Sequence, residues 1–394
     1  MIIKPKTKGF ICTTAHPVGC AQNVKESIEL MNDIKGEGPK SVLVIGSSTG
    51  YGLSSRIAAA FGYGAATLGV AFERAAKGKR TASAGWYNTL AFDKFAKEKG
   101  VIYKSLNGDA FSNEMKEEVI DSIRNIMPNG KVDMVVYSLA SPKRTDSQTG
   151  TTWNSTIKSV GQPFTSKSVD LNDDSVSEVT VDAATPEEIE STIKVMGGED
   201  WHMWMSALKD ADVLDEGVMT LAYSYIGPEI TNAMYKDGTI GIAKQDLYKT
   251  APQIMDLLQD IDGQAFVSVN KAVVTQASAA IPVVPLYISI LFKIMKEEGL
   301  HEGCDQQMKR MFERIFDREN VRNWSNLLTD DDGLIRMDDW EMKPEIQSAV
   351  LELWERVNSD NIFEISDLSG YKTSFLKLFG FDVSEVDYDE DVQP

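Results

Sequence analysis

Two side chains that could deliver a proton to a carbonyl oxygen lie close together in this sequence. Tyr235 and Lys244 are separated by eight residues, in the stretch Y-K-D-G-T-I-G-I-A-K. A lysine charge near a tyrosine hydroxyl lowers the pKa of that hydroxyl and positions a proton donor beside an oxygen that gains negative charge when hydride arrives. Alone, the spacing fits a surface pair without chemistry better than a catalytic pair.

A helix must begin between these two residues if they are to meet. On one unbroken helix of 3.6 residues per turn, positions nine apart lie on opposite faces. Asp237-Gly238 is a turn signal. We therefore expect a helix to begin at Thr239 or Gly241, with Tyr235 on the preceding loop and Lys244 in an early turn.

A glycine-rich join between an apolar strand and a helix lies far upstream. The chain from Ser41 reads S-V-L-V-I-G-S-S-T-G-Y-G-L, with Gly46, Gly50 and Gly52 at the join. Such glycines allow a tight turn and let backbone N–H groups and the helix N-terminus reach a pyrophosphate. The spacing is G-x-x-x-G-x-G, whereas typical dehydrogenases have G-x-G-x-x-G. The alternative is that the glycines only permit strand–helix packing, but the flanking strand and helix favour dinucleotide binding.

An acid follows at the end of the next strand. Glu73, directly after Phe72, lies 23 residues beyond Gly50, where a carboxylate can accept hydrogen bonds from the adenosine ribose. This favours NADH, because the carboxylate would repel the 2′-phosphate of NADPH unless Arg74 or the basic loop 77–80 offsets the repulsion. That loop is either merely solvated or binds a phosphate of the cofactor or of coenzyme A.

The surrounding elements predict an α/β protein with a doubly wound parallel sheet. Six short β-rich runs alternate with helical stretches, at residues 42–45, 66–72, 102–105, 134–137, 219–223 and 266–269. The composition of 144–182 predicts an inserted set of small hairpins and loops. A helix should begin at Thr185-Pro186, with Glu188 completing a capping box. Residues 277–394 should be mainly helical, and 277–292 should form a buried helix entered through prolines, lining an apolar tunnel.

The composition limits the kinds of molecule that this protein can bind. With 40 basic and 59 acidic residues, the net charge is -19, which disfavours binding to nucleic acid or to an anionic membrane. Three cysteines and no leader sequence fit a cytoplasmic protein without disulfides. We expect no metal, because His16, His202 and His301 lack zinc-site spacing and the calcium-like loop 328–339 begins with Leu328 in place of an oxygen ligand. No thiol has a local histidine or helix start that favours a thiolate.

Many motifs together resemble one family, the trans-2-enoyl-CoA reductases and FabV-type enoyl-acyl-carrier-protein reductases. These are enlarged relatives of the short-chain dehydrogenases. The resemblance spans essentially the whole chain and rests on G-F-I-C-T-T-A-H-P-V-G-C, G-S-S-T-G-Y-G, A-G-W-Y-N, N-G-D-A-F-S, V-Y-S-L-A-S-P, V-M-G-G-E-D-W, Y-S-Y-I-G-P, the Tyr235/Lys244 pair, S-V-N-K-A-V-V-T and I-P-V-V-P-L-Y. It implies a single Rossmann domain over 1–394 with a substrate-covering lid, in a monomer. The implied activity is reduction of the carbon–carbon double bond of enoyl-CoA or enoyl-carrier-protein thioesters by NADH, in fatty acid synthesis.

The resemblance also assigns roles to residues. It places the cofactor pyrophosphate on Gly46, Ser47, Ser48, Thr49, Gly50 and Tyr51, and the adenosine end at Phe72 and Glu73. The adenine edge would lie on Asp109 and Ala110, the nicotinamide ribose along Leu139 and Ala140, and the nicotinamide amide against Val273, Val274 and Thr275. Tyr235 would be the proton donor and Lys244 the ligand of the cofactor ribose. Tyr225 would face the substrate, as a second donor in preference to a pocket wall.

Two other functions stay open. A carbonyl reductase would use the same Tyr and Lys, although ordinary short-chain dehydrogenases space them by three residues. A nucleotide-binding scaffold without chemistry would keep the fold, but it would not need an intact Tyr235/Lys244 pair. Between coenzyme A and carrier-protein thioesters, the net charge of -19 slightly favours coenzyme A, because carrier proteins are acidic.

Overall fold

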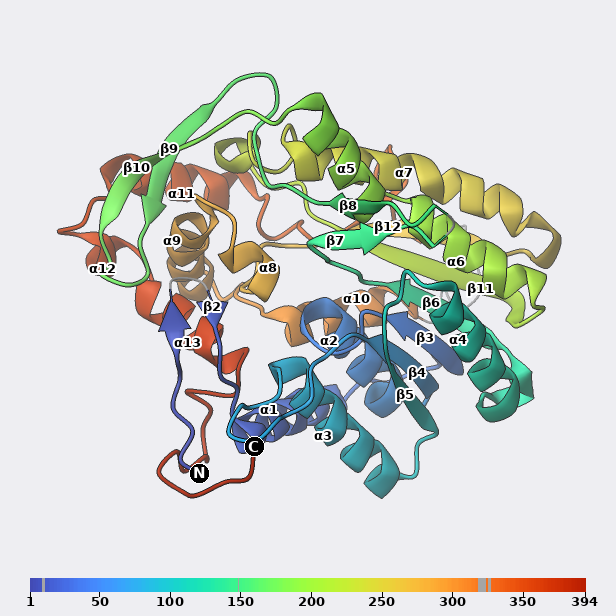
Figure 1. The fold of residues 1–394 in the computed structure, drawn as a ribbon. Helices are drawn as coiled ribbons and strands as arrows, with labels where there is room; N and C mark the ends of the chain where they lie inside the picture. Colours follow the sequence, from blue (N-terminus) through green and yellow to red (C-terminus); the bar gives the residue numbers. More distant parts are fainter. Residues whose placement is uncertain (9–10, 148, 318–323, 325–326) are drawn as a thin grey trace.

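The computed structural model describes residues 1–8, 11–147, 149–317, 324 and 327–394. Gly9 and Phe10, which begin the first motif quoted above, lie outside the described residues. The described chain is built around a seven-stranded sheet with helices on both faces (Figure 1).

All seven strands of this sheet are parallel, in the order β5-β4-β3-β6-β11-β12-β13. The connections reverse direction between β3 and β6, the kind of switch point at which doubly wound sheets bind ligands. The strands are β3 (Ser41–Ile45), β4 (Ala66–Ala71), β5 (Tyr103–Asn107), β6 (Val132–Tyr137), β11 (Leu214–Ser224), β12 (Gln264–Val269) and β13 (Leu334–Arg336). All six predicted strands are present, and the predicted doubly wound sheet is confirmed. β13 was not predicted.

Alternate residues of each strand pack on opposite faces, as the period of two requires. Val42 and Val44 face one apolar layer, whereas Leu43 and Ile45 face the other. The first layer contains α1 (Pro17–Met31), α2 (Gly50–Ile57), α3 (Ala84–Lys99) and α10 (Cys304–Ile315). The second contains α4 (Asn113–Ile126), α6 (Glu199–Asp210) and α7 (Thr239–Leu257), while α5 (Pro186–Met196) packs on α7.

The inserted segment forms two small hairpins, as predicted. They are β7 (Lys143–Thr145) with β8 (Thr152–Asn154), and β9 (Phe164–Val169) with β10 (Val176–Val181). α5 then begins at Pro186 with the predicted capping box between Thr185 and Glu188. At the N-terminus, β1 (Thr7–Lys8) and β2 (Ile11–Cys12) make a third short pair.

A third apolar cluster lies beyond one end of the sheet and includes Tyr235. Its helices are α8 (Gln276–Ala279), α9 (Val284–Glu297), α11 (Pro344–Arg356), α12 (Ile362–Ile365) and α13 (Leu368–Lys377). Figure 1 shows these helices grouped around α9, with hairpin β9–β10 across them. β9 packs directly on α9.

The apolar run 277–292 forms two helices instead of one, and α9 is the buried helix entered through prolines that was predicted. α8 ends at Ala279 and α9 begins at Val284, with Pro285 in its first turn. The break is sharp because Val283 has φ +76° and ψ -39°, a conformation that β-branched residues rarely adopt. Among the residues that the structure describes, no helix is long and apolar enough to cross a membrane.

Candidate active site

The predicted site residues gather at the carboxyl edge of the sheet. Because the strands are parallel and in register, Ile45 lies opposite both Val70 and Tyr137. The segments after β3, β4, β5, β6, β11 and β12 therefore leave the sheet on one side. These segments carry every residue predicted to bind the cofactor except Lys244, which is on α7.

The phosphate turn depends on a close backbone approach. A side chain at Gly52 would put its Cβ 1.9 Å from the carbonyl oxygen of Gly46, and one at Gly46 would come within 2.2 Å of the Ser138 oxygen. Gly50 has φ +53°, and the only atom near the position of its missing Cβ is the Thr275 methyl, at 3.8 Å. The turn is therefore closely packed at Gly46 and Gly52 and open at Gly50.

The open side can hold an anion. The Thr49 side chain at the N-cap of α2 makes no capping hydrogen bond, and the first-turn N–H groups of a helix have no partner within the helix. By contrast, Gly46 N and Ser47 N both donate to the Val70 oxygen. Within the predicted turn, the donors left for a phosphate are therefore those at the start of α2, where the helix dipole also favours negative charge.

Glu73 is held at the end of β4 by neighbours on both sides. The Ser48 hydroxyl donates to Glu73 Oε1 at 2.7 Å, and the Asn107 side-chain amide exchanges two hydrogen bonds with the Glu73 backbone. A side chain at Gly85 would put its Cβ 2.0 Å from Glu73 Oε1. Phe72 beside it is 76% exposed. The contacts made by Ser48 and Asn107 were not predicted, although both residues lie in the motifs.

The remaining predicted cofactor contacts lie on the loops that follow the strands. Asp109 accepts a hydrogen bond from Phe111 N, and the Ala110 carbonyl accepts from Trp204 and Lys116. Leu139 and Ala140 follow β6, and Val273 and Val274 follow β12 as buried residues. Thr275 caps α8 in a reciprocal bond with Ser278.

Tyr235 and Lys244 occupy the predicted elements. α7 begins at Thr239, so Tyr235 lies in the preceding turn and Lys244 in the second turn of the helix. Tyr235 is 7% exposed. Lys244 Nζ donates to the Tyr223 oxygen at 3.0 Å, and burial lowers the pKa of Lys244 to about 8.

The expected lowering of the Tyr235 pKa is wrong. Burial raises the pKa of the Tyr235 hydroxyl above its ordinary value, and the charge of Glu341 raises it further. At neutral pH the hydroxyl therefore keeps its proton. This suits a proton donor and excludes a resting phenolate.

Tyr225 touches Tyr235 but directs its proton elsewhere. The two rings meet edge to face, with centroids 4.5 Å apart. The Tyr225 hydroxyl donates to Glu341 Oε1 at 2.8 Å. Sequence reasoning missed Glu341, which lies just after the unpredicted β13 in a stretch of acidic residues without a motif.

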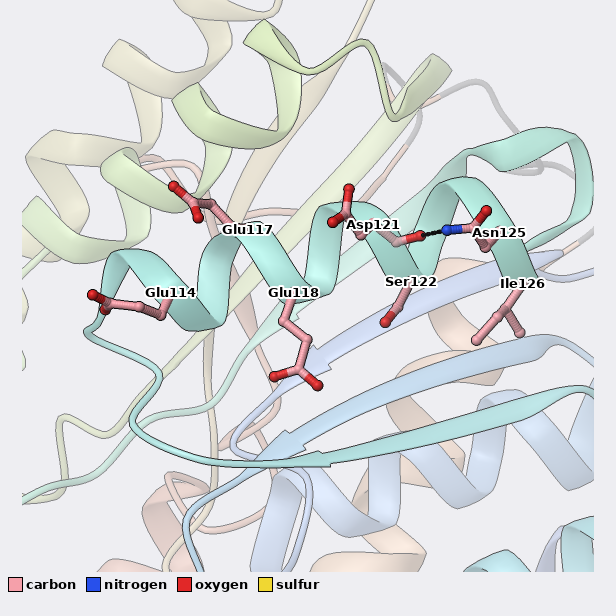
Figure 2. A pocket seen from close by; sticks show the side chains of 7 residues that line it. All are labelled: Glu114, Glu117, Glu118, Asp121, Ser122, Asn125 and Ile126. Carbon is pink, nitrogen blue, oxygen red and sulfur yellow. Dashed lines mark hydrogen bonds between the residues drawn. The ribbon is translucent and has the colours of Figure 1, made fainter.

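Two hollows are lined by residues outside the predicted site. One follows α4 and is lined by Glu114, Glu117, Glu118, Asp121, Ser122, Asn125 and Ile126. Figure 2 shows its carboxylates pointing in different directions from successive turns of α4. Such a surface repels an anionic dinucleotide. The second, of about 440 Å³, has a basic lining that includes Lys4, Lys6, Lys79 and Arg80.

The residues considered above as metal ligands or reactive thiols make ordinary structural contacts. His16 caps α1 by accepting from Gly19 N at 3.2 Å. Asp330, in the calcium-like loop, pairs with Arg336 at 3.1 Å. Cys304 is the first residue of α10, so one thiol does lie at a helix start, which was not predicted. Burial and Asp305 nevertheless raise the pKa of the Cys304 thiol, which keeps it protonated.

Comparison with protein families gives matches along nearly the whole chain. Residues 80–316 match the profile described as trans-2-enoyl-CoA reductase catalytic region, and residues 2–78 match the NAD(P)H binding domain of trans-2-enoyl-CoA reductase. Residues 329–392 match a profile described as enoyl reductase FAD binding domain.

Full-length relatives carry two kinds of name. The chain is 57% identical to a trans-2-enoyl-CoA reductase [NADH] of Ruminiclostridium cellulolyticum, over 100% of this chain and 98% of the relative. It is 54% identical to an enoyl-[acyl-carrier-protein] reductase [NADH] of Flavobacterium johnsoniae, over 99% and 97%. Among crystal structures, trans-2-enoyl-CoA reductase of Treponema denticola in complex with NAD is 46% identical with a TM-score of 0.94, covering 100% of this chain and 98% of that one.

The segment matched to an FAD profile does not fit a flavin dinucleotide. All of residues 329–392 are described, and they form β13 followed by α11, α12 and α13. Gly380 is not part of a phosphate turn, because it packs against α1, where a side chain at Gly19 would put its Cβ 1.8 Å from the Gly380 oxygen. Buried residues of these helices join the cluster around α9. We therefore derive no catalytic step from a flavin.

Proposed function

Because the chain belongs to the trans-2-enoyl-CoA reductase family, we propose that it reduces the carbon–carbon double bond of trans-2-enoyl thioesters with NADH. One observation carries this proposal: a protonated, buried Tyr235 and Lys244 lie at the sheet edge that also holds an uncapped helix start and Glu73. The setting would be fatty acid synthesis.

The cofactor would lie across the switch point between β3 and β6. The start of α2 would hold its pyrophosphate, Glu73 its adenosine ribose, and the segment from Val273 to Thr275 its nicotinamide amide. The open space above Gly50 supports this arrangement. When bound, NADH supplies a hydride to the β-carbon of the enoyl thioester.

Tyr235 would then stabilise the substrate as its charge changes. Negative charge collects on the thioester oxygen, and a hydroxyl that is still protonated can hydrogen-bond this enolate and supply the proton that ends on the α-carbon. Lys244 would donate to the cofactor ribose and stabilise the tyrosinate that forms for a moment. Its low pKa follows from the same burial that keeps water away from the site.

The basic hollow favours coenzyme A over a carrier protein as the thioester carrier. Lys79 and Arg80 lie on the loop that returns from Glu73 to α3, where Ser83 N donates to the Arg74 oxygen. Lys4 and Lys6 face them from the N-terminal segment, although Lys4 also pairs with Asp389 at 2.6 Å. On a chain of charge -19, this local positive site would receive the phosphates of coenzyme A.

Three further points stay predictions. A monomer is implied by the family resemblance, and a cytoplasmic location is favoured by the absence of any disulfide among the three cysteines. The C-terminal helices α9, α11, α12 and α13 would form the substrate cover, since their apolar cluster includes Tyr235.

The function is tested by following NADH oxidation with crotonyl-CoA, a longer enoyl-CoA, the matching enoyl-carrier protein and a simple ketone. We expect turnover of the thioesters and none of the ketone. Ketone reduction with inert enoyl-CoA would instead identify a carbonyl reductase. Binding of NADH without turnover of any substrate would identify a nucleotide-binding scaffold.

Tyr235→Phe and Lys244→Met should lower activity for different reasons. Removing the hydroxyl but keeping the ring should lower kcat by roughly 100-fold with NADH binding nearly intact. Lys244→Met should weaken NADH binding as well as slow turnover, because it removes a donor to the ribose. Fluorescence titration of NADH and steady-state rates separate the two effects. A Tyr235→Phe enzyme with wild-type kcat would remove the proton-donor role.

NADH binding should also depend on pH through Lys244. With its pKa lowered to about 8, Lys244 is an ammonium below that pH and a neutral amine above it. The anionic cofactor favours the charged form, so the Kd for NADH should rise as the pH increases above 8. The Lys244→Met enzyme should lack this rise, and an equal rise in both enzymes would assign it to another group.

Glu73 should set the choice of cofactor. Replacing it with Ala removes the carboxylate that would repel a 2′-phosphate, so activity with NADPH should rise relative to NADH. The matched control is Ser48→Ala, which loses the hydroxyl bound to Glu73 but leaves the charge. An unchanged preference in Glu73→Ala would show that discrimination lies elsewhere.

The basic hollow is tested with the double variant Lys79→Ala/Arg80→Ala. We expect the KM for crotonyl-CoA to rise roughly tenfold, the scale of one charge-assisted hydrogen bond. The KM for crotonyl-pantetheine, which lacks the nucleotide, should not change. The control is Lys97→Ala/Lys99→Ala, which also removes two positive charges. These lysines lie in the last turn of α3, about 20 Å from the first turn of that helix. Equal KM values for coenzyme A thioesters in all three enzymes would leave the loop without a role in binding.

A further inference from the structure

We propose that Glu341 is a positioning residue for the reduction, acting through Tyr225. The proposal rests on the proposed function and adds a residue that the sequence motifs do not contain. Glu341 lies between β13 and α11 and is 0% exposed.

Three donors converge on the Glu341 carboxylate. Oε1 accepts from the hydroxyls of Tyr225 at 2.8 Å and Tyr287 at 2.6 Å, and Oε2 accepts from Ala272 N at 2.6 Å. The Glu341 backbone is itself held, because Gln347 Nε2 donates to its oxygen at 2.7 Å. The Glu341 side chain thus connects the segment after β11, the segment after β12 and α9.

The partners fix the direction of the protons. Ala272 N–H can only donate, so Oε2 is an acceptor. Gln347 Nε2 donates to the Tyr287 hydroxyl at 3.2 Å, which directs the Tyr287 proton towards Oε1. This arrangement suits an ionised carboxylate, and it commits the Tyr225 proton to Glu341 as well.

A buried lysine interacts with the carboxylate: the charge of each group favours the ionised form of the other, while burial lowers the pKa of Lys271. Lys271 is 1% exposed, and its Nζ donates to the Ala272 oxygen at 3.0 Å. Burial raises the pKa of the Glu341 carboxyl, and the charge of Lys271 together with the three donors opposes that rise. A carboxylate without such partners would be costly at this depth.

The consequence is a different role for Tyr225 from the one predicted. Its proton points at Glu341, so it is not a second donor to the enolate. Its ring instead rests edge to face on Tyr235, and its free lone pairs can accept from the substrate side. Glu341 therefore orients Tyr225, and Tyr225 holds the donor Tyr235 in place.

Glu341→Gln is the sharpest test because it keeps the size and reverses part of the hydrogen bonding. Since Ala272 N–H can only donate, the amide oxygen must face Ala272 and the NH₂ must face the tyrosines. The Tyr225 proton would then turn away from residue 341. We expect kcat with crotonyl-CoA to fall on the order of 100-fold, the cost of a misplaced catalytic group, with the Kd for NADH unchanged.

A double-mutant cycle with Tyr225→Phe separates positioning from a purely structural role. If Glu341 acts through Tyr225, the double variant should be no slower than Tyr225→Phe alone. Should Glu341→Gln not fold, the same cycle with Glu341→Asp applies. That variant keeps the charge but shortens the side chain by one methylene. We expect it to lower kcat less than Glu341→Gln does, and to cause no further loss when Tyr225→Phe is also present.

Glu302→Gln is the matched control, since Glu302 is a buried carboxylate that pairs with Arg310 at 2.6 Å. It should lower thermal stability without coupling to Tyr225→Phe. The proposal is wrong if Glu341→Gln keeps wild-type kcat, or if its loss multiplies with that of Tyr225→Phe. Either result would leave the proposed function intact, because the wild-type enzyme tests that separately.

Discussion

Every feature of the site depends on one constraint, the shared direction and register of the sheet strands. With Ile45 opposite Val70 and Tyr137, the chain leaves neighbouring strands at the same height. Gly46 then comes so close to the Ser138 backbone that no side chain fits between them. Residues far apart in the sequence, such as Gly50 and Thr275, face one another for this reason. Both faces of the sheet are covered by apolar helices, which holds the register firmly.

The parts of the molecule that local chemistry dictates could be predicted from the sequence. Short β-rich runs predicted six of the seven strands of the sheet, the turn signal before Thr239 predicted the start of α7, and Thr185-Pro186 predicted that of α5. β13 was not predicted because three residues, 334–336, carry too little periodicity, and only pairing with β12 makes them a strand. Glu341 was not predicted for a related reason. An acidic residue among others becomes informative only when the fold buries it against two tyrosines.

Tyr235 shows where sequence reasoning about chemistry reached its limit. The Tyr–Lys spacing correctly predicted the two elements, but the effect of a lysine on a phenol depends on distance and burial, which spacing does not give. In the structure, Lys244 Nζ bonds to the Tyr223 oxygen, and carboxylate charge lies near the phenol. The balance of burial and charge thus favours a neutral phenol at Tyr235, while burial lowers the pKa of Lys244. A neutral Tyr235 hydroxyl is the form that the proposed proton transfer requires.

The bend at Val283 has a consequence for how this molecule can change shape. A β-branched residue at φ +76° carries strain of roughly 1–3 kcal/mol, which persists only where the surroundings over-determine the backbone. Here Pro282 and Pro285 restrict the chain on both sides, and Val283 is buried. The angle between α8, which begins after Thr275, and α9, which carries Tyr287, is therefore preset. α8 and α9 therefore behave as one rigid corner of the third apolar cluster.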